Sequence, residues 1–322
     1  MKEFSMKAIL FFSDLHQDWK NSVSETLTEQ NVTDFKSVSE LSDFRNLLKL
    51  LPSTWDGIVI FDDLAIQSAS AQDFLMKAKY IAISQSPQTF VSETIPKSVQ
   101  INIIAAHELS HSNQMGHKLF ELALKNSLGT GLIKVEDLYT TDKKEIAFSL
   151  TNTKDKDIIL EAIETEIQNH YSDLSPSMAN FYAGRVGLVG DELILNSIFN
   201  ANPRLAAADR SCVYELKKNE HVDVNLVLDK KYIGISVRDN FGSVDRANLF
   251  KHLSKLNVNE QMVDRKSGGM GLRLTLDSGT QLIINVQQNI VTEMTAIFQL
   301  LPSMKEYKKQ IKTLLWAFQP IS

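Results

Sequence analysis

One helical segment carries a carboxylate and two carboxamides on a single face. Glu192, Asn196 and Asn200 follow one another at intervals of four residues, which places them one above the other on one side of an α-helix. Apolar residues mark a second, buried face of the same helix at Leu188, Leu195, Ile198 and Phe199. Polar groups beside a core are costly, so we interpret the polar stripe as facing a bound ion and its ligand. An ordinary solvated helix face is the alternative.

These residue types fit phosphoryl chemistry. The side-chain oxygen of an Asn suits Mg²⁺, which prefers hard oxygen ligands and often bridges the phosphates of a substrate. A Glu nearby can orient or deprotonate a nucleophile at a γ-phosphate. The stripe therefore predicts a site for a metal-bound nucleotide.

Two later segments support the same interpretation. Residues 232–243 form an alternating, β-branched strand pattern that ends at Asp239 and is followed by a turn containing Gly242. Residues 266–274 form a glycine loop that runs into an apolar segment, where the backbone can approach phosphate and a following helix N-terminus favours anions. The glycines of this loop are Gly268, Gly269 and Gly271.

In this order, the helix, strand and loop motifs resemble the GHKL (histidine-kinase-like, Bergerat) ATPases over roughly the last half of the chain. The resemblance implies an α/β sandwich with a mixed, mainly antiparallel sheet, and ATP and Mg²⁺ as cofactors. It implies that Glu192 acts as the base, that Asn196 binds Mg²⁺ with Asn200 beside it, and that Asp239 accepts a hydrogen bond from the adenine amino group. The glycine loop would cradle the phosphates.

The strand-end motif departs from the family pattern. Phe241 stands where a glycine is expected, and Gly242 is displaced by one position. The adenine contact through Asp239 can survive this change, so Asp239 and Gly242 stay in the expected cofactor site. A similar Asp-x-Phe-Gly-Ser turn occurs in a bacterial subgroup in which a receiver-like domain precedes the GHKL domain.

Residues 6 to about 125 alternate between apolar runs and helical patterns, which is typical of an α/β domain with a parallel sheet. Polar residues at the expected strand ends resemble the response-regulator receivers, a flavodoxin-like family; they are Asp14, Asp62, Asp63 and Ser84. Asp62 or Asp63 would be the phospho-acceptor. The sequence lacks a convincing Lys after a fifth strand, which favours a degenerate receiver used for docking or dimerisation over a working one.

The chain is accordingly divided into a receiver-like domain at 1–125, a connector at 126–150, an ATPase-like domain at 151–301 and a C-terminal helix at 302–322. Residues 142–156 are expected to form linker and helix start, and residues 158–171 a helix. Strands are expected at 211–216, 222–228 and 232–237. A short polar lid at 257–265 resembles that of the anti-sigma-factor serine kinases.

A separate motif suggests zinc. His107, Glu108 and His111 form an H-E-x-x-H sequence, in which two imidazoles bind Zn²⁺ and the Glu activates water. His117 follows where a third ligand could stand. The simpler interpretation, which we favour, is that these histidines decorate the solvent face of a helix; a zinc metallopeptidase is the rival function.

Composition narrows the function classes. The formal net charge of −5 argues against a nucleic-acid binder, and the single cysteine, Cys212, fits a reducing compartment. No apolar run is long enough for a membrane span. We therefore expect a cytoplasmic protein of signal transduction, related to two-component systems, that binds Mg-ATP and acts as a protein kinase or ATPase on a partner protein. A non-catalytic scaffold with degenerate receiver and ATPase modules is the alternative, and a homodimer is left open.

Overall fold

The computed structural model describes residues 6–13, 16–62, 65, 73–75, 77–84, 100–105, 114–129, 132–244, 270–310 and 312–319. The chain is α/β and divides into two compact units. Unit 1 consists of Met1–Ile133 with Thr313–Trp316, and unit 2 of Lys134–Lys312 with Ala317–Ser322.

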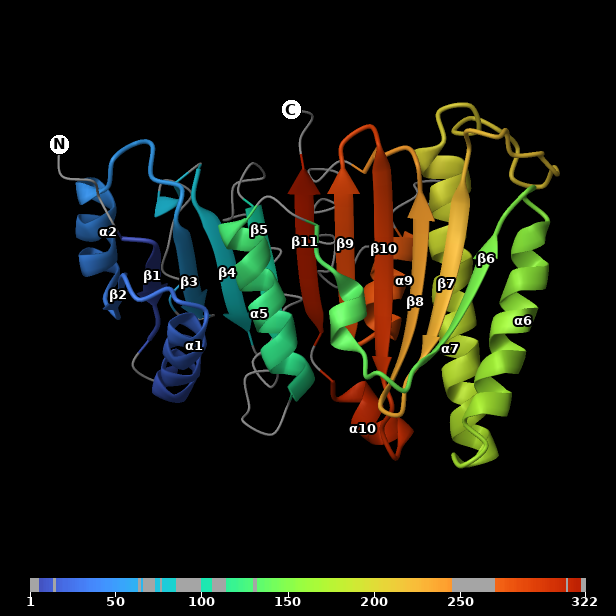
Figure 1. Cartoon of the computed structure of the whole chain (residues 1–322), viewed down its shortest axis with the longest axis horizontal. Helices are drawn as coiled ribbons and strands as arrows, with labels where there is room; N and C mark the ends of the chain where they lie inside the picture. The colour runs from blue at the N-terminus through green and yellow to red at the C-terminus, as the bar shows by residue number, and fades with distance from the viewer. Residues whose placement is uncertain are drawn as a thin grey trace. The chain divides into compact units, whose positions relative to one another are not determined.

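Unit 1 is built on a parallel sheet (Figure 1). Its strands are β1 (Ala8–Phe11), β2 (Phe35–Val38), β3 (Ile58–Asp62), β4 (Lys79–Ser84) and β5 (Gln100–Ala105), and its helices are α1 (Gln17–Glu29), α2 (Leu41–Leu50) and α5 (Gln114–Leu128). The strand order is β2-β1-β3-β4-β5, one of the common orders of doubly wound sheets. Strands β1 and β3 are buried at every position, as expected for near-continuous apolar strands in a sheet covered on both faces.

Unit 2 is built on an antiparallel sheet with the order β9-β10-β8-β7-β6. These strands are β6 (Lys144–Ser149), β7 (Val222–Leu228), β8 (Tyr232–Asp239), β9 (Gln281–Gln287) and β10 (Val291–Gln299). The helices are α6 (Asp155–His170), α7 (Pro176–Leu195), α9 (Met270–Ser278) and α10 (Met304–Lys308), with a 3-10 turn η4 (Val135–Leu138) and a π-helical turn η5 (Asn196–Ala201) that continues α7.

The core of unit 2 lies between this sheet and helices α6 and α7 (Figure 1). On β8, Ile233, Ile235 and Val237 are buried against the two helices. The residues between them point to the opposite face because strand side chains alternate. On α6, the buried residues Ile159, Ile163 and Ile167 recur every four positions and form one apolar stripe.

The α/β class expected from the sequence is confirmed. The expected strands at 222–228 and 232–237 correspond to β7 and β8, and the expected helix at 158–171 corresponds to α6. Residues 142–156, expected to form linker and helix start, contain the edge strand β6, whose residues are all half-exposed or exposed. The expected helix start is confirmed, since α6 begins at Asp155. Residues 211–216, expected as a strand, form only an isolated bridge between Asn152 and Glu215.

The C-terminal helix expected within 302–322 is wrong. Helix α10 ends at Lys308, and Thr313–Gln319 forms strand β11. Its apolar run Leu314–Ala317 is at most 2% exposed, and four consecutive buried residues fit a strand covered on both faces better than a surface helix. Within unit 1, Leu314 pairs antiparallel with Ile103 of β5.

A buried amide anchors β11 in unit 1. The Trp316 backbone N–H donates to Oδ1 of Asn102 at 2.6 Å, and both residues are at most 1% exposed. We expect Asn102→Ala to lower the free energy of unfolding of unit 1 by about 1–3 kcal/mol, because the Trp316 N–H loses its buried acceptor. Urea unfolding followed by tryptophan fluorescence measures this, since all 3 tryptophans (Trp19, Trp55, Trp316) belong to unit 1.

The control is Asn46→Ala on the exposed side of α2, which should change the stability by less than about 0.5 kcal/mol. Equal effects of the two substitutions would contradict the anchoring role of Asn102.

Candidate functional site

Asp239 is a buried carboxylate at the end of β8. It is 3% exposed, and its Oδ1 accepts a hydrogen bond from the Phe241 N–H at 3.0 Å. The backbone N–H groups of Gly242 and Thr292 and the Ser197 side chain also act to lower its pKa. Burial nevertheless dominates and raises the pKa of Asp239 to about 6. An additional hydrogen-bond donor at this position would therefore stabilise the ionised form of Asp239.

The polar stripe of the long helix forms a connected chain of hydrogen bonds. Nδ2 of Asn196 donates to Oε1 of Glu192 at 2.9 Å, and Nδ2 of Asn200 donates to Oδ1 of Asn196. Glu192 and Asn196 are half-buried, whereas Asn200 is exposed. Burial raises the pKa of Glu192, against the hydrogen bond from Asn196. The expected shared face therefore exists, with its polar groups paired to one another.

The stripe and the strand end meet through a residue that sequence reasoning missed. Ser197, the neighbour of Asn196 in the chain, is 6% exposed, and its side chain acts to lower the pKa of Asp239. It lies in the π-helical turn η5, a geometry often found at functional positions. A serine between apolar helix residues gave no signal in the sequence, because its role depends on where β8 ends.

A second missed residue is Arg210. Its guanidinium donates to Oδ1 of Asn200 at 2.9 Å and lies 5.6 Å from the centroid of the Phe199 ring. Its charge also acts to lower the pKa of Glu192. The segment after the helix must fold back for this contact, so no local pattern predicts it. Arg210 places a cation beside the stripe.

Gly242 has a structural explanation. Its φ is +57°, and an added Cβ would lie 2.2 Å from the Gln287 carbonyl oxygen and 2.6 Å from the Asn289 nitrogen. Its own carbonyl accepts from the Asn289 N–H at 3.0 Å. The turn after Asp239 therefore packs on the β9–β10 hairpin, which requires glycine at this position whether or not a nucleotide binds.

The strand-end carboxylate of unit 1 is fully enclosed. Asp62, at the end of β3, is 0% exposed, and its Oδ2 accepts from the N–H and the hydroxyl of Ser13 at 2.9 and 2.8 Å. The same oxygen lies 2.8 Å from Nδ1 of His16, and Oδ1 accepts from the Ala65 N–H at 2.7 Å. Phosphorylation of Asp62 would require these contacts to break. Ser84, at the end of β4, is also buried.

Several expected site residues lie outside the described part of the chain: Asp14, Asp63, His107, Glu108, His111, Gly268 and Gly269. Gly271 is the second residue of α9, and His117 lies on α5 with a half-exposed side chain. Among the described residues, no group of three or more His, Cys, Asp or Glu side chains could hold a metal ion.

Comparison with known proteins adds no family. No protein-family model matches the chain, and no curated protein matches it significantly. Within the residues described, no helix is both long and apolar enough to cross a membrane.

The burial of Asp239 makes stability depend on pH. Its pKa is raised from 3.8 to about 6, so the native state holds the proton more tightly than the unfolded state does. The contribution of Asp239 to the free energy of unfolding is therefore greatest below the unfolded pKa and decreases by roughly 3 kcal/mol as the pH rises through the native pKa.

Carboxyl ¹³C NMR should give a titration midpoint near 6 for Asp239, assigned by its absence in Asp239→Asn. Urea unfolding of both proteins should show wild type losing stability relative to the variant over the same pH interval. A midpoint near the ordinary value of an aspartate would contradict the burial argument.

Proposed function

We propose that unit 2 binds Mg-ATP in the manner of a GHKL ATPase and that the protein acts in cytoplasmic signalling as a kinase or ATPase on a partner protein. The observation that carries this proposal is the contact between η5, which begins at Asn196, and β8, which ends at the buried Asp239. It joins the Glu192 and Asn196 stripe to a buried carboxylate at a strand end, so residues far apart in the sequence come together in the combination that the resemblance requires.

The adenine part of the proposal rests on Asp239. A carboxylate this deeply buried is disfavoured in its charged form, and the exocyclic amino group of adenine would supply a donor that stabilises that form. Binding would thus relieve part of the burial cost of Asp239. This gives a physical reason for keeping an acid at a position where an apolar residue would pack more easily.

The metal part rests on the donor set of the stripe. Oδ1 of Asn196 and the carboxylate of Glu192 are half-buried oxygen donors on one helix face, which fits the preference of Mg²⁺ for oxygen. Bound Mg²⁺ would neutralise charge on the phosphates. Asn196 would have to give up the hydrogen bond from Asn200 to bind the ion, while Glu192 would orient or deprotonate the acceptor hydroxyl or water.

The direction of α9 supports a phosphate site at the same end of the sheet. Ser278, its last residue, contacts Arg185 of α7 at 3.3 Å, and β9 begins shortly afterwards at Gln281. Because α9 packs on α7 and β9, we infer that it runs antiparallel to β9. Its N-terminus would then be directed toward the sheet end that holds Asp239, where it favours an anion.

Unit 1 is proposed as a degenerate receiver-like docking module. Its parallel strand order β2-β1-β3-β4-β5 is that of flavodoxin-like sheets. The saturated hydrogen bonding of Asp62 favours docking of a partner, or dimerisation, over phosphorylation.

Two observations favour a second candidate, a non-catalytic scaffold. The polar groups of Glu192, Asn196 and Asn200 satisfy one another, so the stripe is stable without an ion. Phe241 also replaces a glycine of the family pattern. In this alternative the ATPase fold survives as a platform for a partner.

Calorimetric titration with ATP and Mg²⁺ separates the two candidates. We expect saturable binding by the wild type, and affinity at least about tenfold lower in Asp239→Ala and in Asn196→Ala, because each loses a polar contact to the ligand. Asn180→Ala is the matched control, since Asn180 lies exposed on the same helix and contacts Gln168. Absence of binding by the wild type would reject the nucleotide proposal and favour the scaffold.

A further inference from the structure

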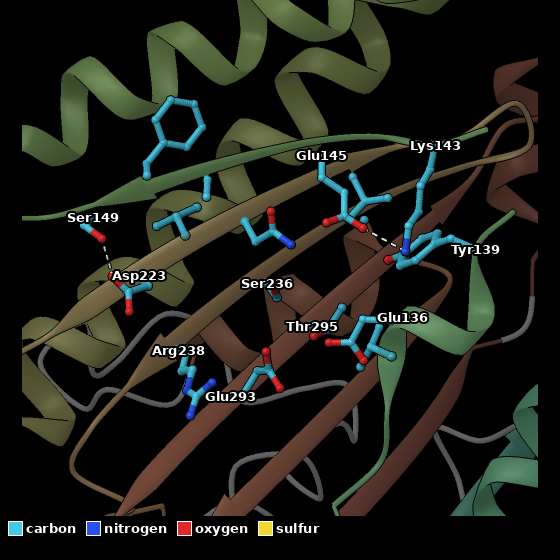
Figure 2. A pocket seen from close by; sticks show the side chains of 17 residues that line it. Glu136, Tyr139, Lys143, Glu145, Ser149, Asp223, Ser236, Arg238, Glu293 and Thr295 are labelled. Carbon is cyan, nitrogen blue, oxygen red and sulfur yellow. Dashed lines mark hydrogen bonds and ion pairs between the residues drawn. The ribbon is translucent and has the colours of Figure 1, made fainter. Parts of the chain in front are cut away.

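The sheet face of unit 2 that points away from α6 and α7 holds a pocket of about 390 Å³ (Figure 2). Its floor includes Gly234, Ser236 and Arg238 of β8 and Glu293 and Thr295 of β10. These residues alternate with the buried ones that face the helices. We call this the open-face pocket. Its volume is in the range of small-molecule sites.

One wall of the open-face pocket is the segment containing η4 and Tyr139. The N–H and hydroxyl of Thr140 both donate to Oδ2 of Asp229, at 2.9 and 2.5 Å, which fixes the end of this segment. Tyr139 then lies against Gly234, where an added Cβ would be 1.8 Å from its hydroxyl oxygen. Only glycine leaves room for this arrangement.

The Tyr139 hydroxyl is unpaired. The residue is 8% exposed, and its oxygen is buried without a hydrogen-bond partner among the described residues. Figure 2 shows the hydroxyl end of the ring directed toward the pocket rather than away from it. A buried hydroxyl without a partner carries a desolvation cost of about 1–3 kcal/mol. A ligand that hydrogen-bonds it would remove that cost.

The charged groups of the pocket fall into two classes. Some are already paired: Lys143 bonds Glu145 at 2.7 Å, and Ser149 donates to Asp223. In contrast, no described residue forms a hydrogen bond or ion pair with the side chain of Arg238 or of Glu136, and the Glu293 side chain has only a 3.4 Å contact with Asn285. The pocket therefore offers one guanidinium and two carboxylates to a ligand.

These groups are arranged along the floor. Arg238 stands opposite Glu293 in the β8–β10 register. Burial raises the pKa of Glu293, the nearby charge of Glu136 raises it further, and the charge of Arg238 acts to lower it. Gly234, with the Tyr139 hydroxyl against it, is four residues from Arg238 on the same strand, or about 13 Å. One end of the pocket thus presents carboxylates beside a guanidinium, and the Tyr139 hydroxyl lies further along it. This arrangement matches a ligand that carries an ammonium group and a carboxylate next to each other and a polar side chain.

We propose that the open-face pocket binds a free α-amino acid with a polar side chain. Arg238 binds its carboxylate, Glu293 and Glu136 bind its ammonium group, and the side chain extends over Ser236 and Thr295 toward the Tyr139 hydroxyl. This goes beyond the proposed function, because the pocket and Asp239 lie on opposite faces of β8. An amino acid bound here would make unit 2 responsive to a small metabolite as well as to nucleotide.

The first experiment titrates the full-length protein calorimetrically with L-glutamine and L-asparagine. At least one should bind saturably, and its N-acetylated and C-amidated forms should bind at least about tenfold more weakly, because each has lost one of the two charges. No binding by either amino acid, or equal binding of the blocked forms, would overturn the proposal.

Variants identify the site for the amino acid that binds. Tyr139→Phe should keep the thermal stability, since it removes an unpaired buried hydroxyl, and should weaken binding about tenfold. Arg238→Gln should weaken it at least as much. Glu145→Gln is the matched control, because Glu145 lines the pocket but is already paired with Lys143; its affinity should stay within about twofold.

Affinity unchanged in both Tyr139→Phe and Arg238→Gln would reject the open-face pocket even if the amino acid binds elsewhere. Titration of Tyr139→Phe with Mg-ATP keeps the two proposals apart. Nucleotide affinity should be unchanged in this variant whether or not the amino acid is bound by the wild type.

Discussion

The alternation of side chains along β8 is the constraint on which unit 2 depends. Both neighbours of this strand pair with it from Ile233 to Asp239, β7 on one side and β10 on the other. The core between the sheet and the helices therefore contains Ile233, Ile235 and Val237. The residues between them face the opposite side of the sheet. A register shift of one residue would exchange the two sets and bury Arg238. Two candidate sites can therefore occupy one strand without sharing a side chain.

Each candidate site retains a polar group where burial is unfavourable. Asp239 continues the core-facing series of β8 as a carboxylate with a raised pKa, and Tyr139 has a buried hydroxyl without a described partner. Packing alone would favour apolar residues at both positions. The glycines beside them, Gly242 and Gly234, are required by close approach of neighbouring atoms. The backbone is thus shaped around these polar groups.

A comparison of the two strand-end carboxylates separates a structural role from a binding role. Asp62 ties the end of β3 to Ser13, His16 and Ala65, and both its oxygens have partners. Asp239 also has partners, but burial outweighs them and its pKa rises to about 6. The first arrangement holds connecting segments onto a parallel sheet. At Asp239, in contrast, a further hydrogen-bond donor would stabilise the charged form of the acid.

Periods of two and of about four residues in the sequence are enough to predict the α/β class and the strands β7 and β8. They also predict that Glu192, Asn196 and Asn200 share one helix face. That Thr313–Gln319 is a strand depends on long-range contacts, because an apolar run gives no period and its pairing partner, β5, is far away in the chain. The tertiary structure is therefore needed to assign it. It also decided the roles of Ser197, Arg210 and the open-face pocket. Those contacts join segments distant in the sequence, and no local pattern records which side chains long-range folding will bring together.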